Sequence, residues 1–146
     1  MKWLKRKAFE WKVFAMSRFF SYSKVESLKI ALEKKGCHFL GSGRHRAVFL
    51  LKSKNSVIKI PLNEDGVVAN AQEYRNYLAS KTSNGHIIYV ARCRPFYHCL
   101  LMEYVNPIDK TKIIPTLPDW AYWVDNLQVG LNKKNKLVAY DHTEPL

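Results

Sequence analysis

Residues 37–61 read CHFLGSGRHRAVFLLKSKNSVIKIP, and this stretch decides the expected fold. Three apolar runs, at 37–43, 46–52 and 56–61, are separated by a glycine-containing turn and by the turn-like pair Lys54-Asn55. Short runs of this composition, bounded by turn residues, are typical of strands. The stretch therefore predicts three consecutive strands of an antiparallel meander.

The segments downstream of this meander predict a helix and further strands. One side of a helix over 67–80 is expected to carry Val67, Ala71, Tyr74 and Leu78. The apolar runs 86–93 and 97–105 flank Pro95 as a hairpin would, and a last strand is expected at 136–141. This order of elements indicates an α+β fold.

Residues 1–36 form a basic region in which we expect amphipathic helices. They carry ten lysines and arginines against three glutamates, which is much of the excess behind the formal net charge of +12. A basic helix face either stays solvated or binds a polyanion. Nucleic acid or an anionic membrane surface would suit the aromatic residues among these lysines: Trp3, Phe9, Trp11, Phe14, Phe19 and Phe20.

Composition limits the classes of protein to which the chain can belong. The 146 residues fit one compact domain, expected over 37–146, and 47% of them are apolar, which suffices for a buried core. The apolar runs fall far short of the roughly 18 residues that cross a bilayer. Three cysteines without a CxxC pair argue against disulfides and zinc. We therefore expect a folded cytoplasmic protein that could at most be peripheral to a membrane.

The turn between the first two strands carries a candidate anion site. It reads Gly41-Ser42-Gly43-Arg44-His45-Arg46-Ala47-Val48, and glycines let backbone amides approach phosphate oxygens. In the third strand Lys59 stands among apolar residues, where a buried ammonium needs an anionic partner. Glu73, in the middle of the expected helix, is the best candidate for that partner.

Two later segments follow in the sequence. The run Leu100–Val105 reads LLMEYV and predicts a buried strand that leads into a proline-containing linker. Asp125-Asn126-Leu127 precedes the last strand, which ends at Tyr140-Asp141. Each residue alone is explained as well by an ordinary turn or strand end. It is their order along the chain that indicates a common site.

From Phe39 to Thr143 the chain resembles the protein-kinase superfamily, most closely the compact kinase-like proteins of phages and bacteria. The resemblance implies a kinase-like N-lobe that binds ATP and consists of a five-stranded antiparallel sheet with a helix. It also implies N-terminal helices before this lobe and a truncated C-lobe after it. Gly41, Gly43 and Val48 match the glycine-rich loop, and Arg46 replaces its third glycine, where it could itself contact phosphate. Lys59 matches the lysine on the phosphates, and Glu73 matches the helix glutamate that holds this lysine.

The resemblance also implies adenine and metal sites. Met102 is similar to the gatekeeper of the family, and adenine would bind the backbone near Glu103 and Val105. Asn126 is similar to the catalytic-loop asparagine, and Asp141 to the aspartate that binds Mg²⁺.

Several departures from the family weaken the expectation of catalysis. Ala121 stands where the family has the aspartate that accepts the substrate proton. Asp119 and Asp125 are close by, but either could replace this base only in an altered loop. The stretch 106–120 is also too short to hold the usual helical lobe before the catalytic loop.

Three functions are compatible with these residues. The leading one is a pseudokinase, a degenerate kinase that binds ATP and acts through contacts with another protein. The second is an active minimal Ser/Thr-type kinase with Asp119 or Asp125 as its base. The third is a non-enzymatic basic adaptor that binds nucleic acid or an anionic membrane surface through its N-terminal helices.

Overall fold

The computed structural model describes residues 24–82, 88–111 and 117–141 of the chain. Its main feature is a five-stranded antiparallel sheet, called sheet A here, with strand order β1-β2-β3-β5-β4. The α+β class and the five-stranded antiparallel sheet are therefore as the sequence predicted. The strands of sheet A are β1 His38–Ser42, β2 Arg46–Leu50, β3 Ser56–Pro61, β4 Cys93–Phe96 and β5 Cys99–Glu103.

Strand β3 lies at the centre of sheet A and is buried on both faces. Successive side chains of a strand point to opposite faces. Ile58 and Ile60 therefore belong to one apolar cluster, whereas Val57 belongs to another, on the face where Lys59 meets helix α3. Burial on both faces explains why β3 reads as a nearly continuous apolar run in which a lysine stands out.

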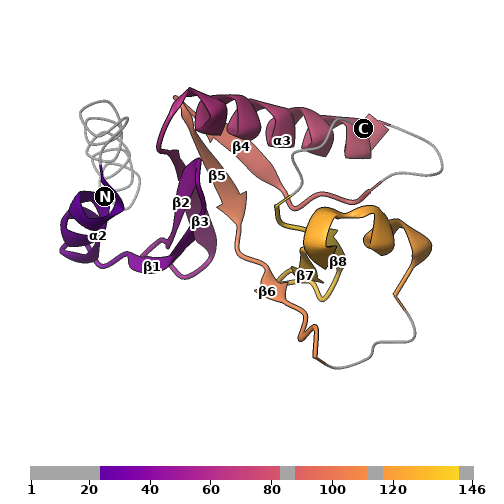
Figure 1. The fold of residues 1–146 in the computed structure, drawn as a ribbon. Coiled ribbons are helices and arrows are strands. Elements are labelled where there is room, and N and C mark those ends of the chain that lie inside the picture. Colours follow the sequence, from indigo (N-terminus) through magenta and orange to yellow (C-terminus); the bar gives the residue numbers. More distant parts are fainter. Residues whose placement is uncertain (1–23, 83–87, 112–116, 142–146) are drawn as a thin grey trace, which may run out of the picture.

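Two helices cover the opposite faces of sheet A (Figure 1). Helix α2, Val25–Glu33, packs Leu28 and Leu32 against the face of Ile58. Gly36 follows this helix with a φ of +81°, a conformation that glycine adopts without steric cost. Helix α3, Glu64–Thr82, lies on the other face.

Helix α3 differs from its prediction in both its start and its buried side. It begins at Glu64, because the side-chain oxygen of Asn63 accepts a hydrogen bond from the Gly66 N–H (3.0 Å) and caps the helix. The predicted apolar side was wrong: Leu78 is exposed, and Val67 and Tyr74 are only partly buried. The buried residues are instead largely polar: Gly66, Asn70, Glu73, Asn76 and Tyr77.

The hairpin of β4 and β5 turns two residues later than predicted. Pro95 pairs with Leu100 inside β4, and the turn falls at Tyr97-His98, with Tyr97 at a φ of +54°. Strand β4 is the edge of sheet A, and an edge strand tolerates a proline, which has no N–H to donate. Residues 88–91, expected in this hairpin, instead lie beside a later strand, with a parallel bridge from Val90 to Ala139.

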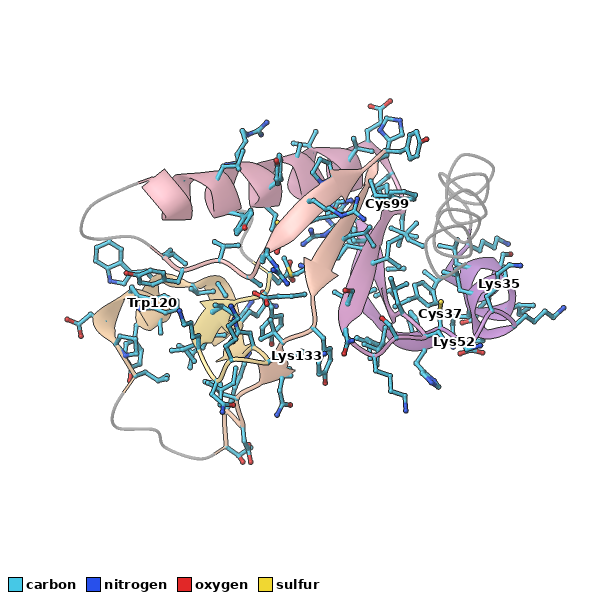
Figure 2. The ribbon with its side chains drawn as sticks, turned by 180° about the vertical axis from the view of Figure 1, so that it is seen from behind. Lys35, Cys37, Lys52, Cys99, Trp120 and Lys133 are labelled. Carbon is cyan, nitrogen blue, oxygen red and sulfur yellow. The ribbon has the colours of Figure 1, made fainter. Side chains whose placement is uncertain are left out.

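A second sheet follows directly after β5, and of its strands the sequence predicted only the last. This sheet B has the order β6-β7-β8, formed by Asn106–Pro107, Val129–Leu131 and Leu137–Ala139. Two short 3₁₀ helices, η1 Asp119–Trp123 and η2 Asp125–Leu127, precede β7. Trp120 and Lys133 mark this part of the molecule in Figure 2, and Lys35 and Lys52 mark the end where α2 lies.

The first expected helix, residues 2 to about 20, lies outside the described residues. Within the part that is described, no helix is both long and apolar enough to cross a membrane.

Candidate functional site

The residues that could carry chemistry meet where sheet A, helix α3 and the end of β8 come together. Lys59 and Glu73 are almost fully buried, with 3% and 0% of their surface exposed. The Nζ of Lys59 donates to both carboxylate oxygens of Glu73, at 2.7 and 2.9 Å. The ion pair expected from the sequence is therefore present, and it joins β3 to α3.

The end of β8 brings Asp141 to the same ammonium. Lys59 also donates to the backbone oxygen of Tyr140, and its Nζ lies 3.6 Å from Oδ1 of Asp141. Residues separated by more than eighty positions thus share one charged group. Tyr140 is partly buried beside this carboxylate, and burial, with the negative charge of Asp141, raises the pKa of its phenol.

Arg46 completes a network of two cations and two anions. Its Nη1 donates to Oε2 of Glu73 at 2.7 Å, and its Nη2 donates to Oδ1 of Asp141. Burial alone would lower the pKa of Arg46, but the Glu73 and Asp141 carboxylates more than offset this and raise it. The guanidinium therefore stays charged, and the four charges compensate one another in a site where an unpaired charge would be costly.

Asn70, which the sequence analysis did not identify, connects this network to the strands. Its amide nitrogen donates to the backbone oxygens of Lys59 (3.2 Å) and His98 (2.8 Å). Its amide oxygen accepts from Nη1 of Arg46 at 3.1 Å. The sequence signal was the spacing of polar residues along the helix, since Asn70 lies one turn before Glu73.

The glycine-rich hairpin packs against the start of α3. The positive φ of Gly41 (+155°) favours glycine, and Gly43 has open space where a Cβ would stand. A Cβ on Gly66 would lie only 2.2 Å from the backbone oxygen of His45, so the helix and the hairpin approach closely there. This contact sets the distance between the hairpin and the helix that carries Glu73.

The residues expected around adenine lie in one apolar cluster that both sheets share. Met102 and Val105 are buried in this cluster, and Val48 packs against it. The backbone N–H of Glu103 donates to the backbone oxygen of Arg92 (2.9 Å), and the carboxylate of Glu103 accepts from the backbone N–H of Arg92 (2.8 Å). These residues lie at the junction from sheet A to sheet B, where the sequence predicted a strand that leads into a linker.

The expected catalytic residues are not gathered around the ion network. Ala121 is completely buried in the core, and Asp119 is exposed at the start of η1. Asn126 is exposed with a φ of +50°, and its backbone oxygen accepts from Lys110. No hydrogen bond or ion pair joins Asp119 or Asn126 to Asp141 among the described residues, and the Asp125 side chain lies outside them.

Comparisons with known proteins add no relative, because no family model, curated protein or solved structure matches the chain.

Proposed function

We propose that this chain is a kinase-like nucleotide-binding protein, a pseudokinase that binds ATP and acts through contact with another protein. The observation that carries the proposal is the buried pair of Lys59 and Glu73 beside a glycine-rich hairpin, with Asp141 within reach of the same ammonium. In protein kinases a strand lysine paired with a helix glutamate contacts the ATP phosphates. A buried salt bridge rarely stabilises a fold more than apolar packing would, so a binding role explains why it is kept.

The residues present fit the phosphates of a nucleotide. Lys59 supplies a buried positive charge and Arg46 a partly buried one, and the hairpin with Gly41 and Gly43 can bring backbone amides close to an anion. Adenine would lie against Val48 and Met102 and bind the backbone near Glu103 and Val105. Binding of adenine at this position would require the apolar cluster shared by the two sheets to open locally.

Direct titration with ATP tests the proposal. We expect binding by the wild-type protein and a loss of at least about tenfold in affinity for Lys59→Met, because a charge-assisted contact to phosphate contributes about 1.5–3 kcal/mol. Lys52→Met, which removes an exposed lysine from the turn between β2 and β3, is the matched control and should bind normally. Lys59→Arg retains the charge and tests whether any loss reflects misfolding.

Wild-type protein that is folded but does not bind ATP would overturn the proposal. Equal binding by the wild type and Lys59→Met would place the nucleotide elsewhere.

We expect this protein to transfer phosphate inefficiently, if at all. The family's base position is filled by Ala121, which packs in the core and leaves no carboxylate to accept a proton there. With ATP labelled on its γ-phosphate, we expect no more transfer from the wild type than from Asp141→Ala. Transfer that disappears in Asp119→Asn would instead favour the active minimal kinase.

The contact with another protein is proposed on an exposed aromatic surface around η1. Tyr89, Tyr122 and Trp123 each expose more than half of their surface, and Tyr89 stacks edge to face on Trp120 with centroids 5.5 Å apart. Exposed aromatic side chains of this size are typical of protein contact sites. A photoreactive residue at position 123 should crosslink to a partner in cells, whereas one at exposed position 54 should not.

A further inference from the structure

The carboxylate of Asp141 already has positively charged and hydrogen-bonding partners in the protein itself. Its Oδ1 accepts from Nη2 of Arg46 and lies 3.6 Å from Nζ of Lys59. With its amide oriented to donate, Gln128 places Nε2 2.8 Å from the backbone oxygen of Asp141 and 3.3 Å from Oδ2. Both carboxylate oxygens are therefore within reach of donors from three side chains.

This arrangement does not fit the Mg²⁺ site that the resemblance to kinases implies. Mg²⁺ needs nearly ideal octahedral geometry and is held by carboxylate, phosphate and water oxygens. A dication at Asp141 would have to displace Arg46 or stand beside two positive charges, which costs electrostatic free energy in a partly buried site. Asn126, the other expected ligand, is exposed and shares no hydrogen bond with Asp141 in the described part of the chain, where no three acidic, histidine or cysteine side chains converge either.

We infer that this site binds the phosphates of a nucleotide without a divalent metal ion, with the guanidinium of Arg46 in the place of the metal. The inference rests on the proposed function and specifies its ligand as the metal-free form of the nucleotide. In kinases the metal neutralises phosphate charge and is fixed by the aspartate that Asp141 resembles. Arg46 shares both properties of this metal ion. It carries a permanent positive charge that can neutralise phosphate, and it is held in place by Asp141 and by Glu73.

Arg46 also has donors left for a ligand. A guanidinium has five N–H groups, and three are used by Asn70, Glu73 and Asp141. No acceptor is found for the other two within the part of the chain that the structure describes. A phosphate can therefore bind Arg46 without breaking the network that holds it, and a planar fork suits phosphate oxygens.

The experiment is a calorimetric titration of the wild-type protein with ATP, once with excess Mg²⁺ and once with excess EDTA. We expect binding in EDTA at least as tight as in Mg²⁺, since metal-free ATP carries more negative charge toward Lys59 and Arg46. Arg46→Gly, which restores the family's glycine, should lose about tenfold or more of the affinity in EDTA and regain part of it when Mg²⁺ is added. Arg44→Gly is the matched control, because Arg44 is exposed in the same hairpin.

The outcomes separate this inference from the proposed function. ATP binding that requires Mg²⁺ in the wild type would overturn the inference and leave the proposed function standing, and this measurement needs no variant to fold. Tighter metal-free binding by Arg46→Gly than by the wild type would also overturn it, because Arg46 would then block the site. An absence of binding in both conditions would overturn the proposed function itself.

Discussion

At the scale of single residues, the two charged side chains that are buried among the described residues, Lys59 and Glu73, compensate each other. Lys59 was recognisable in the sequence as a lysine inside an apolar strand, and the cost of an unpaired ammonium predicted an acid nearby. The sequence indicated Arg46 as a possible phosphate contact, but it did not predict that Arg46 joins the ion network. Its contacts to Glu73 and Asp141 exist only in the folded chain.

Removal of Glu73 should destabilise the protein strongly. Glu73→Ala leaves the buried Lys59 and the partly buried Arg46 with Asp141 as the one carboxylate that pairs with them among the described residues, and the loss of one member of a buried ion pair costs about 3–5 kcal/mol. Urea denaturation would measure this change. Glu26→Ala removes an exposed carboxylate that pairs with Lys29 at 3.6 Å, and as a control it should change the free energy of unfolding by less than about 1 kcal/mol. Equal effects of the two variants would contradict the importance of the buried network.

At the scale of the elements, the sequence predicted what alternation and turn residues determine. The strands β1 to β3 follow from short apolar runs between turns, and each formed close to its predicted place. Helix α3 was predicted, but with the wrong side buried, because amphipathicity assumes that apolar residues face the core. Here Asn70 and Glu73 are buried because the strands and Arg46 supply their hydrogen-bond partners. Such a conflict between pattern and structure is expected where residues serve a function.

Other elements were missed because their causes lie elsewhere in the fold. The position of the turn in the β4–β5 hairpin could not be predicted from Pro95. A proline is tolerated inside β4 because β4 is the edge strand of sheet A. Strand β7 has three residues and pairs with segments on either side of it, so its own sequence carries little signal. Of the candidate site, Lys59, Glu73, Arg46 and Asp141 were expected from the sequence, Asn70 was missed although its spacing from Glu73 carried a signal, and Gln128 was not predicted.

The close approach of α3 to the glycine-rich hairpin gives a prediction about these elements. Gly66→Ala should destabilise the protein by about 1–3 kcal/mol, because the new Cβ would overlap the backbone oxygen of His45 and force the elements apart. In an open helix the same change would stabilise by up to about 1 kcal/mol. Gly43→Ala, which meets nothing within 4 Å, is the control and should be nearly neutral. Thermal unfolding of the two variants measures the difference, and an increase in stability for Gly66→Ala would contradict the packing described.

At the scale of the whole molecule, sheet A separates two parts with different chemistry. One face carries the ion network, helix α3 and the contact to sheet B, whereas α2 covers the other face. Strand β3 is buried on both faces, and the lysine at its centre meets its partners on the face of α3. Helix α2, in the described part of the basic region, therefore lies on the side away from the proposed nucleotide site, and a role for the basic region can be tested separately.

The basic region gives the last prediction, which concerns polyanion binding by the entire chain. If residues 1–36 bind nucleic acid or an anionic membrane surface, then deletion of 1–22, which removes six of the lysines and arginines, should abolish that binding. The dependence of affinity on salt should flatten, because each lost contact with a phosphate reduces the number of counterions released. Fluorescence anisotropy with a labelled oligonucleotide, and sedimentation with anionic vesicles, measure the two possibilities. Replacement of Lys133, Lys134 and Lys136 by glutamine, in the turn before β8, is the charge control and should leave the affinity unchanged. If the deletion has no effect, the positive charge of this region serves solubility alone, while ATP binding by the shortened chain would still report on the site at Lys59.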